Sequence, residues 1–370
     1  MHLGTAALLE FHARHRDDDA LVLVTVTATR GSTYRKPGAM MLIADDDSYV
    51  GLISGGCLEG DLLQHAHCVF EEGGARRVVY DMHSDEDLVW GLGIGCDGVI
   101  ELLLQKLERD QHQALFDVIR RALADRRRVM FALVTGSDDS ALPAGTIATV
   151  DEAGERFGDA RLAEFAAARL GAGWPESRFL RGEVDSSEAM LINLLPQPRV
   201  LLCGGGPDAV PIARLVSELG WQCVVADHRP AYASARRFPA GTRVILTRPE
   251  SLANEADLAE IDAAVVMSHH LESDATYLRQ LALLAASGSL RYLGVLGPTA
   301  RRERLRDMAD VSALAPEVRI HGPVGLDIGA ELPEAIALAV VAEIHAVFNG
   351  RDGQALTRRA RTIDPVGHAA

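Results

Sequence analysis

The chain has 370 residues, of which 48% are hydrophobic, so it is long enough to form two domains with sizeable cores. Its 37 basic and 52 acidic residues give a net charge of -15. That charge argues against a nucleic-acid-binding protein and against an anionic-membrane binder, because both need a positive field. The first residues lack the pattern of a signal peptide, and the longest apolar run, 335–348, is too short to span a bilayer. We therefore expect a soluble, cytoplasmic protein.

The first half of the chain predicts a mixed α/β domain over residues 1–195, with no strict alternation of strand and helix. Strands are expected at 21–26, 39–54 (two, around an acidic turn), 76–84, up to 105, 129–136 and 145–159. Helices are expected from Leu58 to the stop signal Gly73-Gly74, and over 111–127 and 160–173.

The composition changes at Pro196 and Pro198, which form a short stiff connection. Beyond it, strand and helix alternate, which predicts a parallel sheet covered on both faces, a Rossmann-like doubly wound domain over 199–350, followed by a tail at 351–370. Its expected strands are 199–203, 222–228, 242–246, 263–269 and 292–297, and its expected helices are 207–220, 274–287, 300–310 and 333–349.

The five cysteines are odd in number and contain no C-x-x-C pair, so neither a disulfide framework nor a structural zinc site is predicted. Cys68, Cys203 and Cys223 lie within apolar helix or strand patterns and are expected to be buried as small hydrophobic residues. Cys57 and Cys96 differ, because both lie in glycine-rich stretches.

The stretch "GLISGGCLEGD", residues 51–61, marks the first candidate binding site. Gly55 and Gly56 free the backbone for close approach to a ligand, and Cys57 lies near a helix N-terminus, where unpaired amide donors favour a thiolate. The alternative is a small residue packed at a helix start. Glu59 and Asp61 either line the site or complement the helix dipole, and the dipole interpretation is favoured. Cys96 has a setting similar to that of Cys57.

A basic loop, "TRGSTYRKPGA", lies between two predicted strands. Arg30, Arg35 and Lys36 in this loop have the chemistry to hold a phosphate, with Ser32 and Thr33 adding hydroxyl groups. A solvated loop of basic residues is an equally good interpretation.

In the second domain, Gly204, Gly206 and Ala209 have the G-x-G-x-x-A spacing directly after a strand and before a helix. This is the dinucleotide fingerprint, and Asp227 lies where a carboxylate accepts hydrogen bonds from a ribose. The same turn could hold another phosphate-bearing ligand or serve the fold alone.

Three further residues follow predicted strands or precede a helix. His269 and His270 are placed at the carboxyl edge of the sheet, the usual ligand side of this fold. Asp327, between Gly325 and Gly329, either orients a ligand or closes a turn.

Together, several passages resemble the xanthine dehydrogenase accessory factor (XdhC/CoxI) family nearly from end to end. They include "TRGSTYRKPGAMML", "GLISGGCLEGDL", "GLGIGCDGVIELLL", "LLPQPRVLLCGGGPDA" and "IHGPVGLDIGAELPEAIALAVVAEIHAVFNGR". The resemblance implies a chaperone that binds molybdenum cofactor, protects it while a cysteine desulfurase installs its terminal sulfur, and delivers it to an apo-enzyme of the molybdenum hydroxylase class. Pro207 departs from the histidine that the family often has.

The cofactor that the resemblance implies is an anionic pterin with a phosphate and a dithiolene-bound metal. In this interpretation Cys57 contacts molybdenum, and the remaining candidate residues hold other parts of the cofactor or a dinucleotide: Gly55, Gly56, Cys96, Arg30, Arg35, Gly204, Gly206, Asp227, His269, His270 and Asp327. A homo-oligomer is left open.

Two alternatives belong to other classes of protein. One is an NAD(P)-dependent oxidoreductase that uses the Gly204 turn, Asp227 and one of the two histidines as acid or base; it is weakened because the first domain has no recognisable hydride-acceptor site. The other is a sulfur-transfer enzyme in which Cys57 carries a persulfide.

Overall fold

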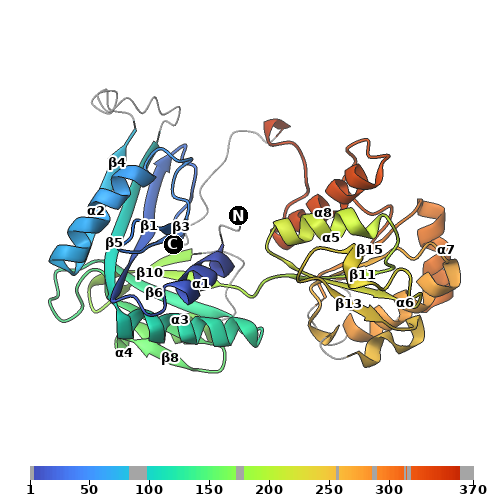
Figure 1. The fold of residues 1–370 in the computed structure, drawn as a ribbon, viewed down its shortest axis with the longest axis horizontal. Coiled ribbons are helices and arrows are strands. Elements are labelled where there is room, and N and C mark those ends of the chain that lie inside the picture. Colours follow the sequence, from blue (N-terminus) through green and yellow to red (C-terminus); the bar gives the residue numbers. More distant parts are fainter. Residues whose placement is uncertain are drawn as a thin grey trace. The chain divides into compact units, whose positions relative to one another are not determined.

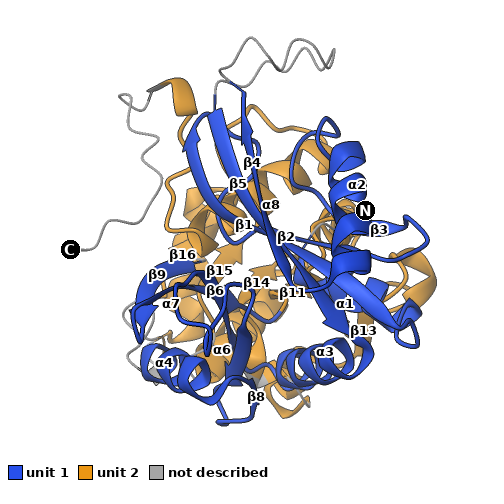
Figure 2. Cartoon of the chain, turned by 90° about the vertical axis from the view of Figure 1, so that its left-hand side faces the viewer, with its two compact units in different colours: residues 1–196, 363–370 blue, residues 197–362 orange. Residues whose placement is uncertain are grey.

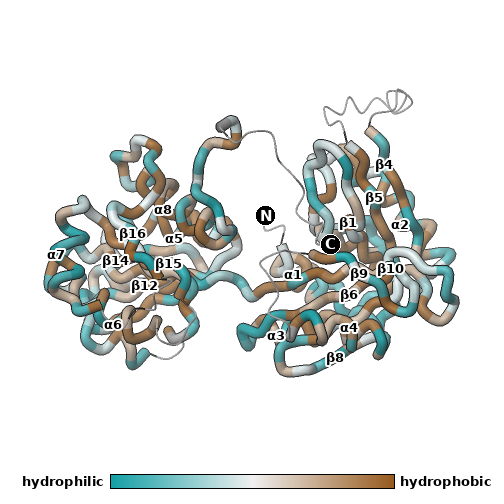
Figure 3. The backbone as a smooth tube through the Cα atoms, turned by 180° about the vertical axis from the view of Figure 1, so that it is seen from behind, coloured by the Kyte–Doolittle hydropathy of each residue, from teal (hydrophilic) through white to brown (hydrophobic). Residues whose placement is uncertain are grey.

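A computed structural model describes residues 4–82, 98–171, 179–255, 258–285, 290–311, 314 and 318–358. Backbone contacts divide the chain into two compact units, one up to Pro196 and one from Gln197 (Figure 2). Hydrophobic residues follow the central strands of each unit, whereas α7 (Thr299–Ala309) is largely hydrophilic (Figure 3). Within the described residues, no helix combines the length and the apolar character needed to cross a bilayer.

The first sheet of unit 1 is antiparallel and has the strand order β3-β2-β1-β5-β4. Its strands are β1 (Ala20–Gly31), β2 (Met40–Ile43), β3 (Tyr49–Gly51), β4 (Ala75–Asp81) and β5 (Gly98–Glu108). Alternate residues of β1 face two different cores, so the strand is buried on both faces. Helix α2 (Glu59–Glu72) covers one face, and its end at Gly73 confirms the predicted stop.

The second sheet of unit 1 is also antiparallel, in the order β8-β7-β6-β10-β9. It comprises β6 (Val129–Gly136), β7 (Ile147–Asp151), β8 (Arg156–Gly158), β9 (Phe179–Val184) and β10 (Ser187–Leu194). Helix α4 (Ala160–Gly171) packs on one face, while α1 (Thr5–Arg14) and α3 (Arg109–Ala124) share a core with the other face and the first sheet. Strands β9 and β10 were not predicted.

A buried histidine pair connects α1 to α3. His112 Nε2 lies 3.1 Å from the carbonyl oxygen of Asp18 and therefore donates to it. His112 Nδ1 then accepts from His12 Nε2 at 3.1 Å, and His12 Nδ1 accepts from the Arg120 guanidinium at 3.0 Å. Burial, with the neighbouring His112 and Arg120, lowers the pKa of His12 to about 4, and burial also lowers that of His112. Both rings are therefore neutral in the folded protein.

We expect this pair to make folding sensitive to mild acid. The unfolded chain protonates His12 near its ordinary pKa of 6.5, whereas the folded chain resists protonation down to about 4, so the contribution is complete above pH 6.5 and is lost as pH falls toward 4. Urea unfolding of wild type and His12→Phe at several pH values measures this contribution. The free energy of unfolding of wild type minus that of His12→Phe should decrease as pH falls from 6.5 toward 4. A value of this quantity that is independent of pH would contradict the assignment.

Unit 2 has a six-stranded parallel sheet in the order β13-β12-β11-β14-β15-β16. Its strands are β11 (Arg199–Cys203), β12 (Gln222–Asp227), β13 (Arg243–Leu246), β14 (Ala263–Val266), β15 (Tyr292–Val295) and β16 (Ile320–His321). The order reverses between β11 and β14, so the loops after these strands flank the topological switch point.

Helices cover both faces of this sheet. Helices α5 (Ala209–Glu218) and α8 (Pro333–Phe348) pack on one face, and α6 (Leu271–Ala285) and α7 pack on the other (Figure 1). The strand order and the two helical layers confirm the predicted Rossmann-like fold. The two-residue strand β16 was not predicted.

The three cysteines expected to be buried divide into two kinds. Cys203 in β11 and Cys223 in β12 are buried, as predicted. Burial raises the pKa of the Cys203 thiol well above its usual range and that of Cys223 to about 12, which makes both thiols unreactive. The prediction is wrong for Cys68, which is half-buried because it lies toward the edge of the buried face of α2.

Candidate functional site

The loop before α2 is folded around the hydroxyl of Ser54. The backbone amides of Gly56, Cys57 and Leu58 donate to Ser54 Oγ at 3.2, 3.0 and 3.0 Å. The side chain of Cys57 is exposed. The prediction of unpaired amide donors around Cys57 is therefore wrong: these amides point inward to Ser54, and the exposed group of the loop is the thiol.

Glu59 holds this loop from the first turn of α2. Glu59 as a whole residue is 2% exposed. Its Oε1 accepts hydrogen bonds from the amides of Ile53 and Ser54 at 3.1 and 2.9 Å, and its Oε2 accepts one from the Ser54 hydroxyl at 2.5 Å. Burial alone raises the pKa of Glu59, but the hydrogen bonds from Ser54 and Ile53 outweigh it and leave the pKa lowered. Glu59 lies in the first turn of α2, as expected of an acid that complements the helix dipole, but its side chain turns back and accepts hydrogen bonds from the loop, a role that was not predicted.

The glycines beside Cys57 have different reasons to be glycine. Gly56 has φ +107°, a conformation that side chains of L-residues rarely adopt. Gly55 has no such φ, and a Cβ added there, or at Gly60, meets no atom within 4 Å. Packing among the described residues therefore leaves open space on both sides of Cys57, and it does not account for glycine at 55 or 60.

The Cys57 loop and Arg30 lie at the same end of the first sheet. The Tyr80 hydroxyl donates to Asp61 Oδ2 at 2.5 Å, which fixes the first turn of α2 beside the end of β4. Through β5, Tyr80 is in register with Thr29, the residue before Arg30. The Arg30 side chain is 78% exposed and lies 3.7 Å from Glu101, a distance that leaves its charge available to a ligand.

The structure gives less information on the other two predicted site residues of unit 1, Arg35 and Cys96. Arg35 is half-buried in the loop between β1 and β2, where its carbonyl oxygen accepts a hydrogen bond from the Thr33 hydroxyl at 2.9 Å. Cys96 lies outside the described residues. Gly98, the first residue described after it, pairs with Gly31 at the same end of the sheet as Arg30.

In unit 2, the glycine turn after β11 is packed against the loop after β14. Gly204 has φ +124°, and a Cβ there would lie 2.7 Å from backbone atoms of Met267 and Ser268. A Cβ at Gly205 would lie 2.7 Å from the carbonyl oxygen of Tyr232, and one at Gly206 the same distance from Asp208 Oδ1. Backbone contacts within the chain thus require glycine at 204 and 205, whereas at Gly206 the contact is with a side-chain oxygen.

We expect Gly204→Ala to lower the free energy of unfolding by about 3 kcal/mol, because the new methyl group combines a strained φ with overlap of backbone atoms. Gly55→Ala is the matched control and should change stability by less than about 0.5 kcal/mol, since its Cβ meets open space. Urea unfolding monitored by circular dichroism compares them. Equal midpoints for the two variants would refute this explanation of the Gly204 turn.

Asp227 is occupied by donors of its own unit. The side chain is 1% exposed; it accepts the amide of Gly205 at 2.8 Å and the guanidinium and amide of Arg229 at 2.7 to 2.9 Å. Burial raises the pKa of Asp227, but these hydrogen bonds, chiefly from Arg229, lower it below its usual value. The acceptor atoms that a ribose would use are therefore engaged within the chain.

An Asp–His pair spans the switch point. His269 Nε2 lies 2.6 Å from Asp208 Oδ2, and His269 is 63% exposed with φ +65°. Asp208 is the N-cap of α5, which is the position where a pyrophosphate binds in dinucleotide-binding folds. A carboxylate there repels a phosphate, so the geometry disfavours a dinucleotide at the turn. Asp208 was not predicted as a site residue, although it directly follows Gly206-Pro207.

His270 and a second carboxylate fix the same loop. His270 Nδ1 lies 3.1 Å from the Ser273 hydroxyl at the start of α6. Asp274, which was also not predicted, is buried; it accepts the amide and hydroxyl of Ser268 at 3.0 and 2.5 Å and pairs with Arg301 at 2.6 Å. The loop after β14 is thus held by side chains on both sides of the predicted histidines.

Asp327 is exposed in a loop that Glu343 of α8 holds. The Glu343 carboxylate accepts the amide of Gly325 at 2.8 Å and the hydroxyl of Tyr292 at 2.5 Å, and it lies 3.1 Å from His321 Nδ1. Glu343 was not predicted as a site residue, although the sequence offered a signal: it is the only carboxylate in the apolar run 335–348. In the described part of the chain, no group of three or more His, Cys, Asp or Glu side chains is arranged to hold a metal ion.

Comparison with known proteins agrees with both units. The "XdhC Rossmann domain" family matches residues 200–344, and the "XdhC and CoxI family" matches residues 15–81. A protein from Bacillus subtilis (strain 168), named as a probable xanthine dehydrogenase subunit, is 34% identical over 354 residues, covering 93% of this chain and 96% of that protein. The chain therefore belongs to the XdhC and CoxI family, which confirms the resemblance read from its motifs.

Two further proteins are similar over most of their length. The molybdenum cofactor insertion chaperone PaoD from Escherichia coli (strain K12) is 26% identical over 333 residues, covering 88% of this chain and 83% of that protein. A crystal structure described as a xanthine dehydrogenase from Bacillus halodurans matches with a TM-score of 0.75 and 31% identity, covering 93% of this chain and 95% of that one.

Proposed function

We propose that this protein is a cytoplasmic accessory chaperone that binds molybdenum cofactor, supports its sulfuration and delivers it to a molybdenum hydroxylase of the xanthine dehydrogenase type. The observation that carries the proposal is the exposed thiol of Cys57 on a loop held by Ser54 and Glu59, with open space at Gly55. The relatives named as a xanthine dehydrogenase subunit and a cofactor insertion chaperone support it.

The residues of this site suit the chemistry of the cofactor. A thiolate is a soft ligand and suits a metal held by sulfur, so Cys57 is the proposed molybdenum contact. Gly55 and Gly56 allow a bulky ligand to approach the backbone, and the exposed guanidinium of Arg30 is suited to an anionic group of the pterin. The cofactor would supply the metal centre for hydroxylation in the partner enzyme. This protein therefore needs only to bind the cofactor and release it.

Further residues are proposed to contact the cofactor or a second ligand. Arg35 and Cys96 remain proposed contacts of the cofactor. His269, His270 and Asp327 remain proposed contacts of unit 2, exposed on loops that follow a strand or precede a helix. The proposed partners are the apo-hydroxylase and a cysteine desulfurase.

The proposal is tested by activation of an apo-enzyme. Apo-hydroxylase of the xanthine dehydrogenase type is incubated with this protein purified anaerobically from a cofactor-producing host, with and without a cysteine desulfurase and cysteine. We expect hydroxylase activity to appear only when this protein is present, and to rise when the desulfurase system is added. Activation at the same rate by protein from a host that makes no cofactor would overturn the carrier role.

A further inference from the structure

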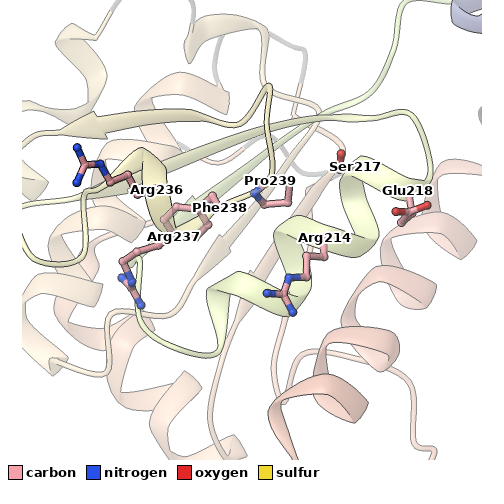
Figure 4. Close-up of a pocket in the computed structure, with 7 residues that line it drawn as sticks. All are labelled: Arg214, Ser217, Glu218, Arg236, Arg237, Phe238 and Pro239. Carbon is pink, nitrogen blue, oxygen red and sulfur yellow. The ribbon is translucent and has the colours of Figure 1, made fainter.

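A groove on the surface of unit 2 gathers positive charge. It lies between the second half of α5 and the short 3-10 helix Ala235–Arg237 with the two residues that follow it, and it has a volume of about 320 Å³ (Figure 4). Seven residues line it: Arg214, Ser217, Glu218, Arg236, Arg237, Phe238 and Pro239. Three arginines and one glutamate therefore line the groove, in a chain whose net charge is -15. In Figure 4 the Arg214 and Arg237 guanidinium groups lie toward the same side, whereas that of Arg236 points away from them at the rim.

Two of these arginines have no protein partner. Among the residues that the structure describes, neither Arg214 nor Arg236 forms a hydrogen bond or an ion pair, and Glu218, one turn further along α5, makes none with Arg214. Both arginine side chains are exposed. By contrast, Arg229 and Arg301 of the same unit pair with buried carboxylates. The charges in the groove are thus left available to a ligand.

The third arginine is held in place without being neutralised. The Arg237 guanidinium donates to the carbonyl oxygens of Gly205 and Tyr232, and it lies over the Tyr232 ring at 5.0 Å from the centroid. Carbonyl dipoles fix its orientation but carry no net charge. A half-buried cation of defined orientation therefore supports the two exposed ones.

We propose that this groove binds the phosphate group of a small phosphate-bearing molecule. Guanidinium groups recognise phosphate through paired N–H donors. Several of them together favour a doubly charged phosphate as the ligand over a singly charged carboxylate. The Ser217 hydroxyl offers a further donor, and Phe238 and Pro239 form an apolar wall. The volume lies at the lower end for small-molecule sites, which begin at about 300 Å³, and is too small for a folded partner. The inference is independent of the proposed cofactor site in unit 1.

Isothermal titration of the full-length protein tests the site, with inorganic phosphate and adenosine 5′-monophosphate as separate probes and adenosine as the phosphate-free comparison. The two phosphate probes separate free phosphate from an organic phosphate as the source of the ligand. We expect one saturable site per chain for a phosphate-bearing probe and none for adenosine. Arg214→Ala and Arg236→Ala should each weaken binding about tenfold or more, because each removes a charge-assisted contact.

Arg304→Ala is the matched control, because Arg304 is an exposed arginine on α7 of the same unit and lies outside the groove. It should bind the probe as wild type does, and Arg214→Lys should be intermediate because it keeps the charge but loses the paired donors. Circular dichroism checks that each variant is folded. The proposal is overturned if neither phosphate probe saturates by about 10 mM, or if the groove variants and Arg304→Ala lose affinity equally.

Discussion

Cys57→Ala is expected to abolish activation of the apo-hydroxylase while leaving the fold intact. The thiol is exposed, so its removal breaks no packing contact, and the loop keeps its shape because the bonds to Ser54 are made by backbone amides. Loss of a metal–thiolate contact should cost more than about 1.4 kcal/mol of binding, which lowers cofactor affinity by over tenfold. The measurement is hydroxylase activity gained per mole of added protein, with urea unfolding as the test of folding.

Cys68→Ala is the control for this variant. Cys68 is the other partly accessible cysteine of the described chain and lies on α2, beyond the loop that Ser54 and Glu59 organise. It should retain activation near the wild-type level. If Cys57→Ala activates the apo-enzyme fully, Cys57 is not the contact that retains the cofactor, whatever the result for Cys68→Ala.

Glu59→Ala is expected to disorganise the loop that carries Cys57. The substitution leaves the amides of Ile53 and Ser54 and the Ser54 hydroxyl without an acceptor in a buried position, and should lower the free energy of unfolding by about 3 kcal/mol. Amides 56 to 58 should lose hydrogen-exchange protection, because the Ser54 hydroxyl is no longer held toward them. Cofactor retention should fall with them.

The contribution of Glu59 also has a defined pH dependence. Its folded pKa lies below the ordinary value of 4.5, so the stabilisation is complete above pH 4.5 and is lost as pH falls through the lower, folded value. Glu71→Ala, at an exposed position on the same helix, is the matched control and should leave both stability and exchange of the loop amides nearly unchanged. Unchanged protection of amides 56 to 58 in Glu59→Ala would contradict the assigned role.

Periodicity and turn residues were sufficient to predict the architecture of unit 2 and much of unit 1. The strand–helix alternation after Pro198 indicates a parallel sheet because a helical crossover returns the chain to the same end of the sheet, so the next strand runs in the same direction. Strands β9 and β10 were not predicted because the turn of their hairpin lacks the usual signal. The turn residues are Asp185 and Ser186, both with positive φ, where a glycine or asparagine usually marks such a turn.

The candidate site was only partly accessible from sequence, because its organising residues act across the fold. Cys57 and its glycines were identified from local chemistry. The loop-holding role of Glu59 was missed because a carboxylate in a first helical turn is expected to complement the dipole, whereas here it also reaches back to Ser54. Asp208 was missed because its partner His269 lies on another loop, 61 residues away, and only strand order brings the two together.

The most direct test of the carrier role is the cofactor content of the protein itself. Wild type, Cys57→Ala and Cys68→Ala are purified without oxygen from a molybdate-fed host, and bound molybdenum and pterin are measured by mass spectrometry and by the fluorescence of the oxidised pterin. We expect wild type and Cys68→Ala to carry both in near-stoichiometric amounts and Cys57→Ala to carry neither. Wild-type protein without pterin would contradict the account.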